Sequence, residues 1–263
     1  MKKEDSSFGR RMLNKVPEVT LYFWIIKILC TTVGETAADF FNTTLNFGLN
    51  GTTVVMGILL VITLFFQFKL RRYVPSIYWL AVVLISIFGT LLTDNLTDKL
   101  GINLATTTVV FSIILAIVFA LWYKVEKTLS IHTINKMRRE GFYWLAVLFT
   151  FALGTAAGDL TAEQFKLGYL VSVIIFAALI AVVTTAHLRF KLNAVLAFWI
   201  AYILTRPLGA SIGDYLSQVK SDGGLGLGTV VTSVIFLLTI LVTVIYLTVT
   251  KKDAVANNEE ALG

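Results

Sequence analysis

Four acidic residues recur at one position of a repeated pattern, and their spacing makes them candidates for chemistry. The pattern begins at a tryptophan, reaches a glycine ten residues later and an aspartate five residues after that. It occurs four times, and the acids are Asp39, Asp94, Asp159 and Asp214. An acid in an apolar stretch is costly unless it meets water, a cation or a partner. The pattern therefore predicts a ring of carboxylates that binds or filters a cation.

The neighbouring residues indicate which cation such a ring would take. Glu35 lies four residues before Asp39 on the same helix face, deeper in the apolar stretch, and is a further candidate for binding a cation or a proton. Carboxylate and hydroxyl oxygens suit hard divalent ions such as Mn²⁺ or Mg²⁺. The only cysteine is Cys30, and the two histidines fall in or beside loops, so a site for a soft metal is not expected.

Small residues precede each acid at a fixed spacing. A glycine and a second small residue stand four positions apart, on one face of a helix, where they let another backbone approach closely. The glycines are Gly34, Gly89, Gly154 and Gly209, and the second positions hold Ala38, Thr93, Gly158 and Gly213. We expect these faces to draw four equivalent helices together through packing.

Two cations inside apolar segments depart from the repeat. Lys27 stands where the other copies have Val82, Val147 and Tyr202, and Arg206 stands where they have uncharged residues. Both are candidate charge partners for the acids. Lys27 lies only three residues beyond Trp24, so we expect it to extend toward the nearer membrane surface. Arg206 is deeper and is the better candidate for a buried ion pair or an anion contact.

The composition places these residues in a membrane. Apolar residues make up 57% of the chain, charged residues 14%, and the mean hydropathy is +0.81. Since a transmembrane helix needs about 20 mostly apolar residues, the sequence predicts an all-α integral membrane protein with eight transmembrane helices. The expected segments are 19–40, 51–69, 77–96, 103–123, 142–162, 168–188, 193–216 and 228–250.

The tryptophan spacings of 55, 65 and 55 residues organise these helices into four helical hairpins in two halves. Two helices per repeat keep every copy in the same orientation, so the hairpins are parallel and the four acids share one depth, about 22 Å along the helix from the tryptophan. The predicted divisions are a tail at 1–16, a first half at 17–123, a loop at 124–141, a second half at 142–250 and a tail at 251–263.

Charge distribution sets the expected orientation. Seventeen of the 22 lysines and arginines lie in the tails and in the loops after even-numbered helices, against three in the opposite loops. This asymmetry predicts a multi-pass protein of the inner (plasma) membrane with both termini cytoplasmic. The basic charge is therefore a topology signal, and no nucleic-acid partner is expected; the expected partners are the lipid bilayer and a small cation.

The four copies of tryptophan, glycine and aspartate resemble those of a family of bacterial and archaeal integral membrane proteins. That family is built from a transmembrane repeat of about 55 residues, usually in four copies, and its function is described as unknown. The resemblance covers residues 18–250. It implies the fold and implies little about activity.

The sequence favours transport of a small cation, either a divalent metal or a proton-coupled ion, through the centre of the helices. One alternative is a non-transporting membrane scaffold or sensor whose acids meet outer water or a neighbouring polar group. Another is a carrier for a small organic cation, held by aromatic rings. An enzyme is not expected, since the chain has no phosphate-binding glycine loop and no histidine deep inside a span to serve a serine nucleophile.

The orientation can be tested with a reporter enzyme that is active only outside the cytoplasm. Fused to residue 251, the reporter should be inactive, because the basic loops hold that end in the cytoplasm. Fused to the predicted outer loop near Lys166, it should be active. The reverse pattern would refute the predicted topology.

Overall fold

The fold is all-α, with two long helices in each of four repeats. A computed structural model describes residues 14–253. Within that range, eight helices are long and apolar enough to cross a membrane, which makes the chain a multi-pass membrane protein. Their helical cores are α1 (Leu21–Asp39), α2 (Gly48–Lys69), α3 (Pro75–Asp94), α4 (Leu104–Glu126), α5 (Met137–Asp159), α6 (Tyr169–Phe190), α7 (Ala194–Ser217) and α8 (Thr229–Thr250).

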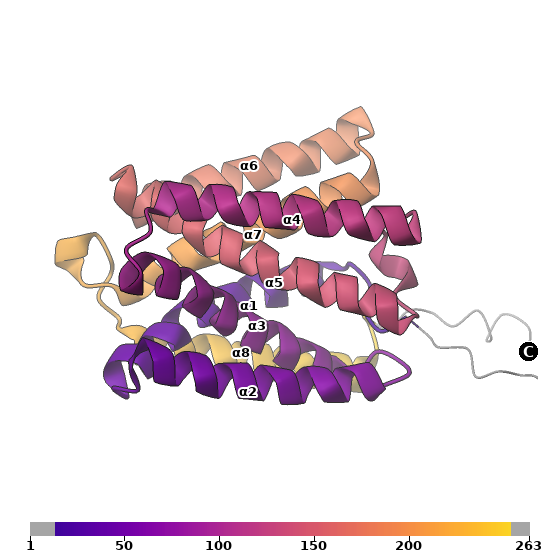
Figure 1. Ribbon diagram of the computed structural model, residues 1–263, viewed down its shortest axis with the longest axis horizontal. Coiled ribbons are helices and arrows are strands. Elements are labelled where there is room, and N and C mark those ends of the chain that lie inside the picture. Colours follow the sequence, from indigo (N-terminus) through magenta and orange to yellow (C-terminus); the bar gives the residue numbers. More distant parts are fainter. Residues whose placement is uncertain (1–13, 254–263) are drawn as a thin grey trace, which may run out of the picture.

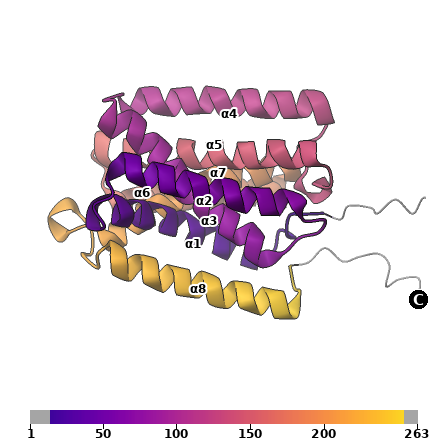
Figure 2. The same ribbon diagram turned by 60° about the horizontal axis from the view of Figure 1, so that its bottom comes forward.

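The first helices of the four repeats form a closed inner ring. Helix α1 packs against α3, α3 against α5, α5 against α7, and α7 against α1. The helices run side by side along the long axis of the molecule (Figure 1). A second view places α4 and α8 on opposite sides of the bundle, with inner helices between them (Figure 2). The ring gives the four copies of the repeat a common axis.

Each outer helix packs against the inner helix of the next repeat. Helix α2 packs on α3, α4 on α5 and α6 on α7, while α8 returns to pack on α1. A hydrogen bond of 2.7 Å from Ser233 Oγ to Thr36 Oγ1 fastens the last helix to the first. The repeats are therefore interleaved, and the contact of α8 with α1 closes the circle.

The outer helices bury one stripe and leave apolar side chains exposed. On α2 the buried residues recur every three or four positions, at Thr52, Met56, Leu60, Thr63 and Gln67. The remaining positions of the helix include exposed valine, isoleucine and phenylalanine side chains. Since lipid tails are as apolar as these side chains, such a face is stable in a bilayer. The outer helices thus separate the inner ring from lipid.

The repeated glycines form the joints of the inner ring. A methyl group on Gly34 would meet Ser86 of α3, and one on Gly89 would meet Phe151 of α5. One on Gly154 would meet Arg206 of α7. Gly209 completes the cycle by facing α1, where Thr31 lies against it. In every case the glycine receives the residue seven positions after the tryptophan of the next inner helix.

The second small positions extend the same joints. Ala38 and Gly213 are buried, and Thr93 donates a 3.0 Å hydrogen bond to the carbonyl of Ala152 on α5. A methyl group on Gly158 would lie 3.6 Å from Pro207 of α7. The small faces therefore join neighbouring inner helices along two levels of the ring.

Three of the four aspartates lie directly before a short π-helical turn. These turns span Phe40–Thr44, Asn95–Lys99 and Leu160–Gln164. The fourth repeat differs, because α7 ends at Ser217 and a longer loop with the short helix Lys220–Asp222 leads to α8. Wide turns of this kind are frequent at functional sites. Here they carry the chain outward from the acid to the next outer helix.

The opposite end of the bundle ties the two ends of the described chain together. The backbone N–H of Glu18 donates to the carbonyl of Asp253 at 2.9 Å, and Tyr73 Oη donates to Asp253 Oδ2 at 2.6 Å. Lys15 is fully buried and its Nζ lies 2.7 Å from Glu140 Oε2. Part of the predicted tail at 1–16 is therefore packed against the helices. We call this the terminal end, and the other the aspartate end.

Two glycines of α5 offer a matched test of the joints. Gly154→Ala should lower stability by about 1–3 kcal/mol, since a methyl group there overlaps the buried Arg206 side chain. Gly141→Ala is the control, because nothing lies within 4 Å of its added methyl group. The measurement is the thermal unfolding midpoint of purified protein. Equal stability of the two variants would contradict close packing at Gly154.

Candidate functional site

The axis of the inner ring is lined by residues four positions apart on each inner helix. Counted from the repeated tryptophan, the positions are one before it and three, seven, eleven and fifteen after it. Neighbouring positions in this series stand about 40° apart around the helix, so the series winds gradually along each inner helix. From the terminal end, the five layers are Phe23, Tyr78, Tyr143 and Phe198; Lys27, Val82, Val147 and Tyr202; Thr31, Ser86, Phe151 and Arg206; Glu35, Thr90, Thr155 and Ala210; and the four aspartates.

Arg206 joins all four inner helices. Its Nη1 donates to the carbonyl of Thr31 on α1 at 3.0 Å, and its Nη2 lies 3.1 Å from Glu35 Oε2 on the same helix. Nη2 also donates to Thr90 Oγ1 on α3 and, at 2.7 Å, to Thr155 Oγ1 on α5. Arg206 is fully buried and Glu35 is 7% exposed. The only acid of the central layers is thus paired with the only arginine of the axis.

This ion pair is held by polar groups on both sides. Thr90 Oγ1 donates to Glu35 Oε2 at 3.3 Å while it accepts from Arg206. Taking a guanidinium and a carboxylate out of water costs several kcal/mol for each ion. The hydrogen bonds from Thr90 to Glu35 and from Arg206 to the two threonines offset part of that cost, although Arg206 Nε has no hydrogen-bond partner among the described residues.

Lys27 lies in the centre of the ring and does not extend to the membrane surface as expected from the sequence. Its side chain is fully buried, with Nζ 4.2 Å from the ring centroid of Phe151 and 4.3 Å from that of Tyr202. Within the described residues, Nζ has no hydrogen-bond partner. The expected role as a charge partner of the acids is therefore met by Arg206 alone, since Lys27 contacts aromatic faces instead.

The four aspartates surround the axis at its other end. Each stands at the same position of its inner helix, and neighbouring inner helices contact one another around the ring. Glu35 lies about one helical turn before Asp39 on α1. Asp214 is buried, and the other three are half-buried. The carboxylates therefore form one electrostatic unit above the Arg206–Glu35 pair, with access to the aspartate end.

The four aspartates do not gather into a direct metal-binding cluster in the described structure. Among residues 14–253, no three acidic, histidine or cysteine side chains are close enough to hold one ion directly. The hydroxyls at the start of the outer helices do not complete such a shell, because they bond to their own helices. Thr52, Thr107 and Ser172 each donate to the carbonyl four residues before them.

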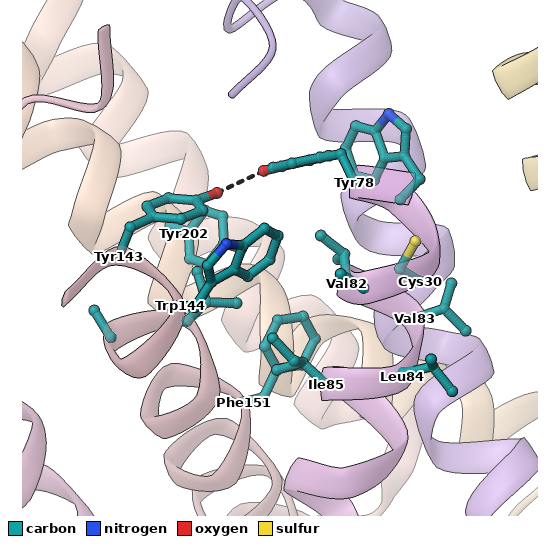
Figure 3. Close-up of a cluster of buried hydrophobic side chains, with 14 of the residues drawn as sticks. Cys30, Tyr78, Val82, Val83, Leu84, Ile85, Tyr143, Trp144, Phe151 and Tyr202 are labelled. Carbon is teal, nitrogen blue, oxygen red and sulfur yellow. Dashed lines mark hydrogen bonds between the residues drawn. The ribbon is translucent and has the colours of Figure 1, made fainter. Parts of the chain in front are cut away.

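The axis is closed at the terminal end by aromatic side chains. Tyr78 Oη and Tyr143 Oη lie 2.5 Å apart in a hydrogen bond across the ring (Figure 3). Phe23, Tyr78 and Tyr143 are buried, and Tyr202 packs against Phe23 with ring centroids 6.3 Å apart. A cavity of about 420 Å³ lies off the axis near this end, between α1, α6 and α7, and does not reach the aspartates.

Sequence reasoning missed this aromatic layer; it named Arg206 as the candidate for a buried ion pair but did not name Glu35 as its partner. It treated Trp24, Gly34 and Asp39 as the marks of the repeat, whereas the axis follows the position before each tryptophan and every fourth residue after it. The period of four was visible in the sequence. The face of each inner helix that lines the axis could be identified only from the closed ring.

The comparisons with known proteins agree with the repeat. Four segments match one family, described as a Repeat of Unknown Function (DUF347), at residues 22–73, 77–128, 142–193 and 197–253. Each matched segment covers one inner and one outer helix. No curated protein and no solved structure matches the chain.

The buried ion pair predicts a specific loss of stability. Glu35→Ala leaves the Arg206 guanidinium without its counter-charge and should cost about 3–5 kcal/mol, measured as a lower thermal unfolding midpoint in detergent. The double variant Glu35→Ala, Arg206→Met should recover most of that loss. Asp222→Ala, at an exposed acid, is the control. A Glu35→Ala variant as stable as wild type would show that the pair does not hold the ring.

Proposed function

The chain belongs to the DUF347 repeat family, and we propose that its four copies together transport a small cation across the membrane along their common axis. The observation that carries this proposal is the ring of four aspartates above Glu35. Five acidic groups around one axis attract a cation, and rings of this type are one way in which proteins build cation pathways. The fifth acid, Glu35, lies deeper in the bundle than the four aspartates, and its charge draws the cation inward.

The lining below the ring supports passage of a charged species. Thr90 and Thr155 flank Glu35, and Ser86 and Thr31 stand one layer below. The oxygens of Thr90 and Thr155 can replace part of the water around a cation, whereas Ser86 and Thr31 lie in the joints against Gly34 and Gly209. A scaffold that only had to pack would be expected to fill these layers with aliphatic side chains, as in the outer helices.

The Arg206–Glu35 pair is the proposed gate. While Glu35 Oε2 accepts hydrogen bonds from Arg206 and Thr90, that oxygen is not free for a passing cation. A cation that reaches Glu35 competes with the guanidinium for the same oxygen. Displacing Arg206 would release the joints with α3 and α5 that its hydrogen bonds form, which couples cation entry to a movement of the inner helices.

The proposed substrate is a hydrated divalent ion of the Mg²⁺ or Mn²⁺ type, or a proton-coupled ion. Mg²⁺ gives up water reluctantly and is bound through a few carboxylates with several waters retained. Carboxylates that contact such an ion through its waters do not have to gather into one coordination shell. With both termini in the cytoplasm, as the loop charges favour, the ring faces the outside of the cell.

A scaffold or sensor is the second candidate, and the closed axis favours it. Aromatic side chains and the ion pair fill the centre, and no described residue opens a path through it. In that case the aspartates only meet outer water. The two candidates differ in whether the purified protein moves ions.

Flux in proteoliposomes decides between them. Wild-type protein should carry Mn²⁺ or Mg²⁺, or protons with them, as followed by an ion-sensitive and a pH-sensitive dye. Asp94→Asn and Asp159→Asn keep the side-chain shape but remove a charge. Each should lower the flux about tenfold, the factor that corresponds to about 1.4 kcal/mol of lost binding.

The matched control is Asp222→Asn, an exposed acid at the aspartate end that lies in the α7–α8 loop. It should keep wild-type flux. Absence of flux in wild-type vesicles that contain folded protein, or equal flux in all three variants, would refute the transport proposal and favour the scaffold.

A further inference from the structure

Lys27 is the only charged residue at its position in the four copies of the repeat. The equivalent residues are Val82, Val147 and Tyr202, which form the same layer of the ring. All four are fully buried. A lysine here cannot reach water, so its ammonium group has to be stabilised by what surrounds it.

What surrounds it is a pair of aromatic faces. The Nζ atom lies 4.2 Å from the centroid of Phe151 on α5 and 4.3 Å from that of Tyr202 on α7. Both distances are within the range at which a cation is attracted to the ring face. Phe151 and Tyr202 belong to the same cluster of buried side chains (Figure 3). Two rings from two helices therefore converge on one cation.

Phe151 also contacts the second cation of the axis. The guanidinium carbon of Arg206 lies 5.6 Å from the same ring centroid. Arg206 has its own acid and hydroxyl partners, whereas Lys27, within the described chain, has no hydrogen-bond partner for Nζ. The two ring faces are thus the contacts of Lys27 Nζ in the described chain, with the charge of Arg206 at the shared Phe151 ring.

We infer that the space between Phe151 and Tyr202 is a second cation site on the axis, specific for a primary ammonium group, and that Lys27 is its tethered occupant. The site lies beyond the Arg206–Glu35 pair as seen from the aspartate end. Because the chain supplies its own ammonium, the site is filled without a ligand. A small organic ammonium is the chemical class that replaces it.

This site has a consequence that rests on the proposed function. A cation that leaves the aspartate ring toward the terminal end would meet the Lys27 ammonium on its path. Passage therefore requires Lys27 to leave the aromatic faces, and Lys27 is the inner barrier of the axis. The binding site itself does not depend on transport and can be tested without flux.

The test removes the tethered ammonium and supplies it in solution. Lys27→Ala lacks the three methylenes and the amine beyond Cβ, which correspond to n-propylammonium. The thermal unfolding midpoint of the purified variant should fall, and n-propylammonium should restore at least half of the loss in a saturable manner, as expected for a ligand of the folded state. Wild-type protein, whose site is filled, should not respond.

Two controls separate a cation site from a simple cavity. The neutral n-propanol should restore less than a quarter of the Lys27→Ala loss. Val82→Ala creates space in the same layer on α3 and should not respond to n-propylammonium. Equal rescue by the alcohol and the ammonium, or no rescue of folded Lys27→Ala by either, would overturn the inference.

A second measurement decides the question if Lys27→Ala does not fold. Phe151→Leu is compared in wild type and in a Lys27→Met background, whose side chain fills similar volume without charge. The fall in thermal unfolding midpoint caused by Phe151→Leu should be at least twofold larger when Lys27 is present, because the substitution then also removes a contact between the ring and the cation. Phe149→Leu, on the same helix but against Phe111, should cost the same in both backgrounds. Equal losses for Phe151→Leu would overturn the inference.

Discussion

A guanidinium group in the middle of a membrane has to be compensated, and the arrangement of the inner helices follows from how this is done. Arg206 is fully buried and no single neighbouring helix supplies all its partners. It takes a carboxylate and a carbonyl from α1, a hydroxyl from α3 and a hydroxyl from α5. If any of the four helices moved away, a polar group would be left unpaired in a low-dielectric interior, at a cost of several kcal/mol. The ion pair therefore holds the four inner helices in a defined relation as well as neutralising two charges.

Close approach of the helices makes this contact possible. Arg206 reaches its partners because Gly154 leaves room for its side chain between α5 and α7, as the other glycines do for the equivalent residues of their neighbours. The symmetric part of the repeat thus builds the ring, and three residues that break the symmetry, Lys27, Glu35 and Arg206, give the axis its charge pattern. Cations stand toward the terminal end, and the acids stand toward the aspartate end. An axis of this polarity attracts cations from one side and opposes them on the other.

The long apolar segments were enough to predict the all-α fold and the eight helices, and the register of tryptophan, glycine and aspartate was enough to predict the four repeats. It also predicted that Gly209 and its equivalents lie at close helix contacts, a role that the structure gives them in a closed cycle. The packing of each outer helix on the next repeat could not be predicted, since near-continuous apolar helices such as α2 and α8 carry no signal for one neighbour over another. The predicted position of the Lys27 side chain was wrong, because a lysine near a helix end usually extends to water. Only the rings of Phe151 and Tyr202, which are distant in sequence, explain its burial. The partner of Arg206 was left open for the same reason.

The central claim is that the four repeats close into one ring, and a disulfide across the closing contact tests it most directly. Ser233 on α8 and Thr36 on α1 are in hydrogen-bonding contact, although almost the whole chain separates them. In a Cys30→Ala background, the pair Thr36→Cys and Ser233→Cys should cross-link on mild oxidation in native membranes. After cleavage at a protease site placed in the loop between α4 and α5, the two halves should stay joined until a reductant is added. Thr36→Cys with Thr239→Cys, on the exposed face of α8, should separate. Separation of the halves in the first pair as well would contradict the closed ring and the axis built on it.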